Sequence, residues 1–362
     1  MKAKKVLALG LGAGLIISMC GCRYDYTYDL SSTGAAKIMQ FAYYTEDEVK
    51  QLSSDTSKYE KVTLEDGKTY YMKSEIEDKS YDELNAGLET GIMKPNLVYV
   101  PCDKIDEQTN SNSESSSVPD LYNAMKINMT YMLNEDVIET NGEVSEDKRS
   151  VYYDYKGKTA EGYLYIYTAS GKNEIDTDTT APVIGGIKKS KYINNLGLKK
   201  IRISDNLALK SVTCNGIDMK SYTYNLEGKQ VRHWMLKDMS QYKQGKNKIV
   251  ATDLSGNKSS FTFKYDSVPP VIKKIKNYQT YYSGKKITFY VKDKTSGISK
   301  VTYFKDYGKE KKVAKKYIKK VKKGKYKGYY KVTLKFNSPC YLKFYVYDKA
   351  GNTSEIYGCN VI

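Results

Sequence analysis

The chain has 362 residues, a formal net charge of +17 and a hydrophobic content of 40%. This composition predicts folded globular domains, two or three at this length, and the positive charge favours anionic partners. The chain has one histidine, His233, so any histidine-based triad or metal site would have to use it. No cysteine or carboxylate cluster lies close to His233 in the sequence, and we expect it to be a structural or surface residue.

The first residues form a basic and then apolar leader. Residues 1–5 carry three lysines, residues 6–19 are an apolar run, and Cys20-Gly21-Cys22 follows. The run suits a signal peptide and is too short to span a bilayer. A cysteine after a small residue at this place resembles the lipobox of bacterial lipoproteins. This resemblance implies cleavage before the cysteine and a thiol that carries diacylglycerol with palmitate-type acyl chains. Cys22 is the predicted lipidated residue because Gly21 precedes it, Cys20 is the fallback, and an ordinary secreted protein is the alternative.

The lipobox resemblance implies an extracytoplasmic protein that is lipid-anchored to the cell membrane. Two or more acyl chains hold a protein stably at a membrane. No second apolar segment of spanning length follows, so the lipid is the predicted membrane attachment. In that location we expect an anionic wall polymer or a glycan as partner, no nucleic acid, and no protein partner that the sequence identifies.

Residues 23–171 alternate short strands with two short helices. Tyrosines alternate with polar residues over 23–29 and the chain runs back over 37–44, which predicts a hairpin. Capping boxes at residues 45–48 and 80–83 predict the starts of the helices. The remaining predicted features are a tight turn at Asp66-Gly67, an exposed loop over 107–118, a turn at Asn141-Gly142, and strands near 127–131, 151–155 and 163–167.

This pattern predicts an α+β unit of mostly antiparallel sheet. The order of its parts, a lipidated cysteine, a hairpin and short turn motifs such as Asn141-Gly142, resembles the LppM-like lipoprotein domain. The resemblance covers residues 22–168 and implies a membrane-anchored envelope domain. No functional residue is carried over from that family.

After a polar linker over residues 172–181, the chain repeats itself in copies of about 90 residues. Each copy opens on proline followed by Val-Ile and ends on an Asp-x-x-Gly-Asn hairpin, at residues 253–257 and 348–352. These motifs resemble bacterial Ig-like domains, which occur in tandem on surface proteins. The resemblance covers residues 177–362 and implies presentation, spacing or adhesion, and seldom catalysis.

The predicted fold class is therefore mainly β, with an N-terminal α+β antiparallel-sheet domain followed by two tandem Ig-like β-sandwiches. The predicted parts are a lipoprotein signal peptide at 1–22, an LppM-like domain at 23–171, a linker at 172–181, and Ig-like domains at 182–266 and 267–362.

The two Asp-x-x-Gly-Asn hairpins predict a local structural role. Asp253 and Asp348 should accept backbone hydrogen bonds across the turn, and Gly256 and Gly351 should take positive φ. A calcium site is the alternative, since some surface Ig-like domains bind that ion through loop carboxylates. Each turn offers one carboxylate in sequence, so no metal site is predicted.

Residues 309–331 hold twelve lysines and one acid, Glu310. Interspersed apolar residues predict strands and a connecting loop with the lysines on a wet face or edge, where they also discourage aggregation. The functional hypothesis is an electrostatic platform for an anionic polymer or membrane surface. The candidate anion-binding residues are Lys311, Lys312, Lys315, Lys316, Lys319, Lys320, Lys322, Lys323, Lys325 and Lys327.

Cys340 and Cys359 flank the last predicted hairpin and would fall almost opposite each other on adjacent strands. They are a candidate disulfide, and two free thiols are the alternative. Cys102 and Cys214 have no evident partner, and no CxxC pair indicates zinc or redox chemistry.

No catalytic, cofactor-binding or metal-binding residue is predicted, because the sequence lacks the phosphate-loop, GxSxG and HExxH motifs. The predicted function is a non-enzymatic, lipid-anchored cell-surface protein that binds or adheres to an anionic or glycan partner in the envelope or on a host, through its Ig-like domains. The alternative is that these domains are a structural spacer for an LppM-like envelope-maintenance domain.

Overall fold

The computed structural model describes residues 23–52, 55–86, 88, 90–101, 126–154, 163–226 and 229–362. The predicted signal peptide with Cys20 and Cys22, the 107–118 loop and Cys102 lie outside these residues. The chain divides into two compact units. Unit 1 comprises residues 1–180 with the two short segments 205–210 and 253–257, and unit 2 comprises the rest. Within the described ranges, no helix is both long and apolar enough to cross a bilayer.

Unit 1 is built on a mixed sheet, of which the alternating tyrosine pattern predicts the first hairpin. Among the described residues, the strand order of this sheet is β3 (Glu60–Thr63), β4 (Thr69–Lys79), β2 (Ala36–Tyr44), β1 (Arg23–Asp29), β7 (Lys126–Met132), β10 (Ser150–Asp154) and β9 (Glu143–Val144). The β1–β2 hairpin is antiparallel, as predicted, and β1 also pairs with β7 in parallel. The strand β1 is therefore an interior strand of its sheet.

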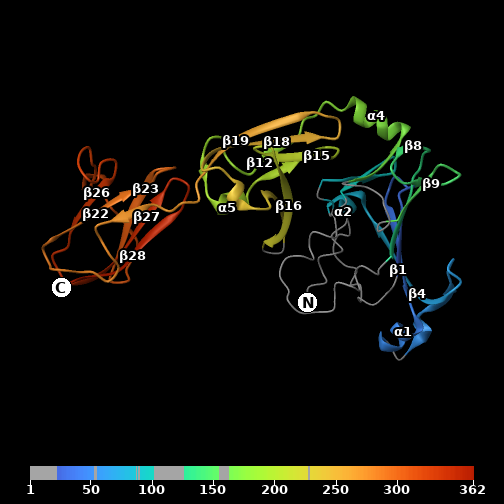
Figure 1. Cartoon of the computed structure of the whole chain (residues 1–362), viewed down its shortest axis with the longest axis horizontal. Coiled ribbons are helices and arrows are strands. Elements are labelled where there is room, and N and C mark those ends of the chain that lie inside the picture. The colour runs from blue at the N-terminus through green and yellow to red at the C-terminus, as the bar shows by residue number, and fades with distance from the viewer. Residues whose placement is uncertain are drawn as a thin grey trace. The chain divides into compact units, whose positions relative to one another are not determined.

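A second sheet of unit 1 has the order β5 (Ile92–Lys94), β6 (Leu97–Pro101), β11 (Tyr163–Thr168) and β8 (Val137–Thr140). The helices α1 (Glu46–Leu52) and α2 (Tyr81–Ala86) lie towards opposite ends of the long strand β4 (Figure 1). Both predicted capping boxes are confirmed. Glu48 accepts hydrogen bonds from the amide and hydroxyl of Thr45, and Glu83 accepts the same pair from Ser80.

The core of unit 1 is rich in buried tyrosine. Tyr131 is 1% exposed, stacks on Tyr28 with ring centroids 4.9 Å apart, and meets the edge of Tyr153 at 5.9 Å. The hydroxyl of Tyr153 donates to the Tyr165 carbonyl at 2.9 Å, so this ring is buried without an unpaired polar group. The high tyrosine content therefore contributes to the interior as well as to the surface.

A helix, α4 (Ala169–Thr177), occupies part of the segment predicted as a polar linker. Thr168 caps its first turn by accepting a hydrogen bond from the Gly171 amide, and Ile175 is buried against the domain. Gly171 permits close packing, because a Cβ at this position would lie 2.1 Å from the carbonyl oxygen of Asn96. The helix depends on this tertiary contact, which sequence periodicity does not reveal.

The first sandwich is formed by two sheets. One pairs β12 (Val183–Gly185) with β14 (Arg202–Ser204). The other has the order β13 (Tyr192–Ile193), β19 (Lys258–Tyr265), β18 (Gly245–Asp253), β15 (Leu209–Cys214), β16 (Ile217–Leu226) and β17 (Lys229–Leu236). The chain's one tryptophan, Trp234, is 3% exposed, and its indole N–H donates to the Ile203 carbonyl at 3.2 Å.

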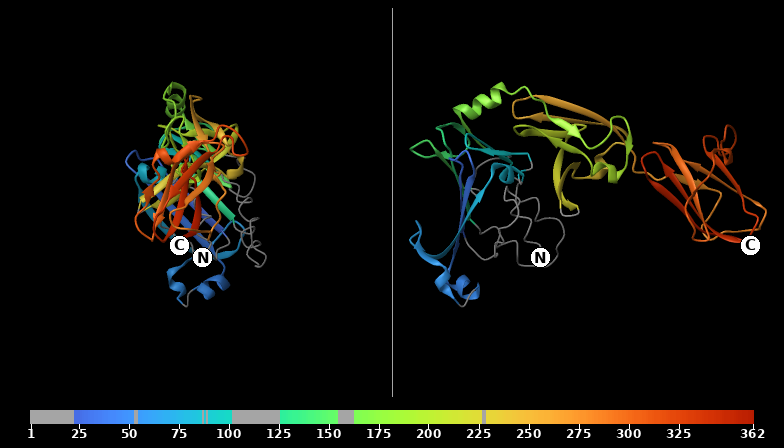
Figure 2. Two further views of the ribbon diagram at one scale, coloured as in Figure 1. Left: turned by 90° about the vertical axis from the view of Figure 1, so that its left-hand side faces the viewer. Right: turned by 180° about the vertical axis from the view of Figure 1, so that it is seen from behind.

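The second sandwich has two layers that can be followed in the right-hand view of Figure 2. One sheet has the order β20 (Val271–Lys273), β22 (Lys286–Lys292), β26 (Tyr330–Lys335) and β25 (Ile318–Lys320). The other has the order β21 (Thr280–Tyr281), β28 (Thr353–Val361), β27 (Cys340–Asp348), β23 (Ile298–Lys305) and β24 (Lys311–Lys312). If the strands β20 to β28 are lettered A, A′, B, C, C′, D, E, F and G, as in Ig domains, the two sheets have the orders A-B-E-D and A′-G-F-C-C′. This is the Ig-like arrangement.

These sheets confirm the predicted fold class, a mainly β chain in which an α+β domain precedes two Ig-like sandwiches. The predicted domain boundaries remain predictions.

The two cysteines of the last hairpin are offset rather than opposite. Cys340 pairs with Val361 and Cys359 pairs with Leu342, and a bulge follows Leu342 in the ladder. Both thiols are free, as is that of Cys214. Cys340 and Cys359 lie on adjacent paired strands, as predicted, but two positions out of register, because sequence spacing gave neither the register nor the bulge.

We predict that the described thiols react slowly in the folded protein. Burial raises the pKa of Cys214 to about 12 and that of Cys359 to about 11, and it also raises the pKa of Cys340. Since the thiolate is the nucleophile, iodoacetamide at pH 8 should label these sites fully only in urea, as read by peptide mass spectrometry. Rapid labelling of Cys359 without urea, or a Cys340–Cys359 linked peptide, would contradict the free, buried thiols.

Candidate functional site

The lysine-rich segment, residues 309–331, runs from an edge of one sheet of the second sandwich to an edge of the other. It supplies the edge strand β24 to one sheet and the edge strand β25 to the other. Val313, 2% exposed, and the half-buried Ile318 fasten it to the core. All ten candidate anion-binding lysines are exposed. The lysine-rich segment therefore has the strands, the connecting loop and the solvent-exposed lysines that the sequence predicts.

The charge of this segment is largely uncompensated within the described structure. Its one acid, Glu310, lies 3.5 Å from the ammonium of Lys300, a residue outside the segment, and accepts a hydrogen bond from Tyr347. None of the ten candidate lysines forms an ion pair with a described carboxylate. A concentrated positive surface without internal counter-charges attracts anions over the range of the Debye length.

Two half-buried tyrosines of the segment, Tyr326 and Tyr329, form a group with Tyr290 of β22. Tyr326 stacks on Tyr290 with centroids 4.1 Å apart and meets the edge of Tyr329 at 5.8 Å. The ammonium of Lys274 lies over Tyr290 and Tyr326, and that of Lys292 lies 5.4 Å from the Tyr329 centroid. Cation–π contacts hold these long side chains at the surface. The region therefore presents aromatic faces together with positive charge.

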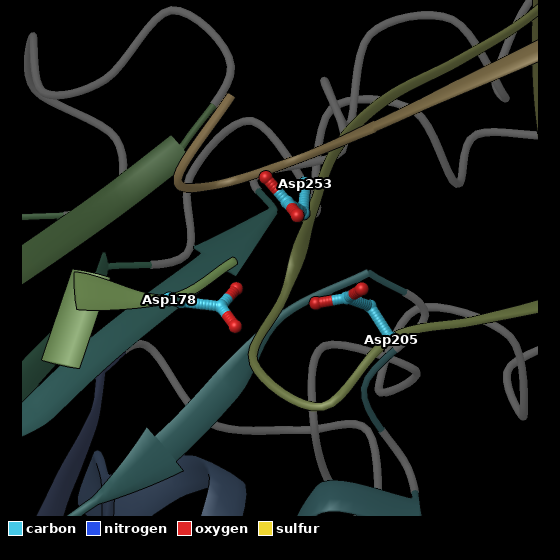
Figure 3. Close-up of side chains that lie close together, drawn as sticks. All are labelled: Asp178, Asp205 and Asp253. Carbon is cyan, nitrogen blue, oxygen red and sulfur yellow. The ribbon is translucent and has the colours of Figure 1, made fainter. Parts of the chain in front are cut away.

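A different kind of site lies in unit 1, where three carboxylates converge. This first aspartate cluster consists of Asp178, the C-cap of α4, Asp205, which follows β14, and Asp253, the last residue of β18. Figure 3 shows the carboxylates of Asp178 and Asp205 pointing towards each other, with Asp253 beside them. One oxygen from each carboxylate lies within 4.8 Å of the others.

Each aspartate of the first cluster uses one oxygen for its own turn. Asp253 Oδ1 accepts from the Asn257 amide at 2.7 Å, and Asp205 Oδ1 accepts from the Leu207 amide at 3.0 Å. Asp178 Oδ1 accepts from the Thr180 amide at 3.0 Å. The other oxygen, Oδ2, of all three residues is buried and has no hydrogen-bond partner.

The electrostatics of the first cluster reflect this crowding. Burial, and then the negative charges of Asp253 and Asp178, raise the pKa of Asp205 above its ordinary value. Burial acts in the same direction on Asp178, but hydrogen bonds from the Thr180 amide and the Asn206 side chain outweigh it and lower the pKa of that carboxyl. Like charges in close contact destabilise one another unless a cation or a proton intervenes.

The second aspartate cluster consists of Asp266, Asp293 and Asp348, which also have oxygens within 4.8 Å of one another. Here the carboxylates are better satisfied. Asp266 accepts from the amides of Val268 and Ser296, and Asp348 accepts from the amides of Gly351 and Asn352 and from the Asn352 side chain. Burial raises the pKa of Asp348 despite these bonds.

The turn roles predicted for the two hairpins are confirmed. Asp253 and Asp348 accept the amide hydrogen bonds across their turns, and Gly256 and Gly351 have φ of 93° and 97°. The sequence did not predict that Asp178 and Asp205, or Asp266 and Asp293, would join them. A signal was present, since an aspartate precedes each opening proline and another directly follows β14 in the first copy and β22 in the second.

His233 lies on β17, is 6% exposed and stacks near Tyr222 at 5.6 Å. Burial, and then the positive charges of Arg202 and Lys199, lower the pKa of its imidazole. It is a buried residue of the sandwich, which agrees with the structural role expected from the sequence.

The model of a domain of unknown function (DUF7743) matches residues 264–361, a range that includes the lysine-rich segment and the second aspartate cluster. No curated protein matches the chain.

Among solved structures, the chain is similar to the titin domains Z1Z2 in complex with telethonin, with 13% identity, coverage of 51% of this chain and 98% of that chain, and a TM-score of 0.19. It is similar to the fibronectin(III)-like modules of Clostridium thermocellum CbhA, with 12% identity, coverage of 50% and 93%, and a TM-score of 0.24. It is also similar to the folded domain of Mycobacterium tuberculosis LppM, with 14% identity, coverage of 43% and 95%, and a TM-score of 0.24. Because TM-scores this low do not establish a common fold, the sandwich assignment rests on the strand order described above.

Proposed function

We propose that the chain is an extracytoplasmic, non-enzymatic lipoprotein, anchored through Cys22, that binds an anionic polymer or glycan of the cell envelope. The binding surface is the lysine-rich segment of the second sandwich. The observation that carries the proposal is the exposure of ten lysines on a segment fixed between two sheet edges, without carboxylate partners among the described residues. A fixed array of cations binds a polyanion more favourably than a mobile tail, because less conformational entropy is lost on binding.

The neighbouring tyrosines support a glycan as the partner. Tyr290, Tyr326 and Tyr329 offer aromatic faces, and amphipathic rings of this kind contribute contact area at low entropic cost. A polymer that carries both sugar rings and negative groups would use the aromatic and the basic parts of this surface together.

The proposal predicts that neutralising the lysines abolishes most binding. A variant with Lys315, Lys316, Lys319, Lys320 and Lys322 replaced by glutamine should bind purified anionic wall polymer about 100-fold more weakly than the wild type at low salt, since the removed charges supply the attraction. Wild-type binding should also weaken steeply between about 50 and 200 mM salt, as counterions compete. Titration of residues 23–362, which contain every described element, measures both effects.

The matched control removes the same charge elsewhere. Its five lysines, all exposed on the first sandwich and all replaced by glutamine, are Lys188, Lys189, Lys191, Lys199 and Lys200. This variant should bind within a few-fold of the wild type. Equal losses in both variants would show a response to net charge alone and would contradict a defined surface, as would binding that is indifferent to salt.

A further inference from the structure

We propose that the first aspartate cluster is a binding site for one divalent cation of the calcium type. The site is formed by the carboxylates of Asp178, Asp205 and Asp253, which come from three separate parts of the chain and lie in the same compact unit. This inference goes beyond the proposed polyanion binding and depends neither on the lipid anchor nor on the lysine-rich segment.

Burial of charge is the first argument. Asp253 is 0% exposed, and its Oδ2 has no hydrogen-bond partner. Asp178 Oδ2 and Asp205 Oδ2 are likewise buried without a partner. Buried carboxylate oxygens that are neither protonated nor hydrogen-bonded are strongly disfavoured, and metal coordination is one of the few ways to satisfy them.

The distances agree with a single bound ion. Calcium takes oxygen ligands at about 2.3–2.6 Å, so ligand oxygens around one ion lie no more than about 5 Å apart. In the first cluster, one oxygen from each of the three carboxylates lies within 4.8 Å of the others. Three carboxylates supply only part of the six to eight oxygens that calcium uses, and water can complete the shell. Magnesium fits less well, because it demands octahedral geometry at about 2.1 Å and gives up its own water reluctantly.

The second aspartate cluster gives an internal comparison. One oxygen from each of its three carboxylates also lies within 4.8 Å of the others, but both oxygens of Asp266 and both of Asp348 accept hydrogen bonds from the protein. No oxygen of these three described residues is a buried atom without a partner. The same arrangement of three aspartates thus occurs in both repeats, but only the first has buried carboxylate oxygens without a hydrogen-bond partner among the described residues.

A bound cation would fix two loops to the end of α4. The Asn257 side chain already donates to the Asp178 carbonyl at 2.9 Å, and the Leu254 amide donates to the Ala208 carbonyl at 2.9 Å. Leu207 and Ala208, close to Asp205 in the chain, pack in a core cluster with Ile175 of α4. By cancelling the repulsion among the carboxylates, the ion would hold these apolar residues in their packed positions.

The stability of the first sandwich provides the test. Trp234 is the chain's one tryptophan and bonds to Ile203, two residues before Asp205, so its fluorescence reports on the strands that lead into the site. We expect residues 23–362 to unfold at a midpoint about 3–6 °C higher in about 5 mM calcium than in chelator, as followed by Trp234 fluorescence on heating. This shift corresponds to a calcium dissociation constant of about 10⁻⁴–10⁻³ M.

The variant Asp205→Asn separates a cation site from a merely structural cluster. Asparagine can still accept from the Leu207 amide but removes one negative charge. In chelator the variant should have a higher midpoint than the wild type, because it relieves repulsion. In calcium the order should reverse, because the variant loses the ion. The control Asp218→Asn, at an exposed site on the same sandwich, should match the wild type in both buffers.

Direct titration gives a second readout. By calorimetry, Asp205→Asn and Asp178→Asn should each bind one calcium ion fewer than the wild type, with circular dichroism in chelator confirming that both are folded. The proposal is overturned if the wild-type midpoint is the same in calcium and chelator, or if Asp205→Asn shifts it equally in both. An equal response to magnesium would overturn the assignment to calcium.

Discussion

Gly186→Ala is expected to destabilise the first sandwich by about 3–5 kcal/mol. Gly186 directly follows β12 and has φ of 81°, in the region that disfavours residues with a side chain. A Cβ built on it would lie 1.6 Å from the carbonyl oxygen of Lys200. That oxygen belongs to the backbone, so relief requires the main chain itself to move. The expected loss combines this displacement with the strain of positive φ.

Gly216→Ala is the matched control. Gly216 lies in the same sandwich and has φ of 84°, but a Cβ there would meet nothing within 4 Å. Only the backbone strain should remain, about 1–2 kcal/mol. Urea unfolding followed by Trp234 fluorescence measures both variants, since this tryptophan is buried in the first sandwich. Similar losses for the two glycines would refute the close approach of the Gly186 and Lys200 backbones.

Phe344→Ala should destabilise the second sandwich by about 3–5 kcal/mol. Phe344 is 0% exposed on β27, and its ring lies 5.2 Å from that of Phe289, a 0% exposed residue of the facing sheet. Truncation leaves a cavity between the two layers, which the rigid strands on either side can fill only in part.

The adjacent residue supplies the control for Phe344. Tyr345 points to the opposite face of β27 and is half-buried, so Tyr345→Ala should cost less than half as much. Because this sandwich has no tryptophan, pulsed alkylation of Cys340 and Cys359 across a urea series, read by peptide mass, reports its unfolding. An unchanged midpoint in Phe344→Ala would contradict the packing of the two sheets through these rings.

Much of the fold could be predicted because its signals are local. Alternating tyrosines specify the β1–β2 hairpin, and the capping boxes at Thr45 and Ser80 specify where two helices begin. The lysine-rich segment was recognisable as strand and loop because Val313 and Ile318 interrupt the charges. In each case the determining residues lie within a few positions of one another.

The features that could not be predicted depend on distant contacts. Helix α4 has a polar sequence and is held by burial of Ile175 and by the fit of Gly171 against Asn96. The offset of Cys340 and Cys359 follows from the register of the hairpin and from a bulge, which only the paired strands define. Only one residue of each aspartate cluster could be predicted, because each hairpin motif contains a single aspartate. The other two carboxylates of each cluster come from loops that are distant in the sequence.

The place of β1 in its sheet has a mechanical consequence. Every residue from Arg23 to Asp29 is matched to β2 on one side and to β7 on the other. A load applied at Arg23 along the strand must shear two ladders at once, whereas the same load on a strand at a sheet margin would shear only one. The strand that follows the predicted lipid anchor is therefore suited to bearing tension.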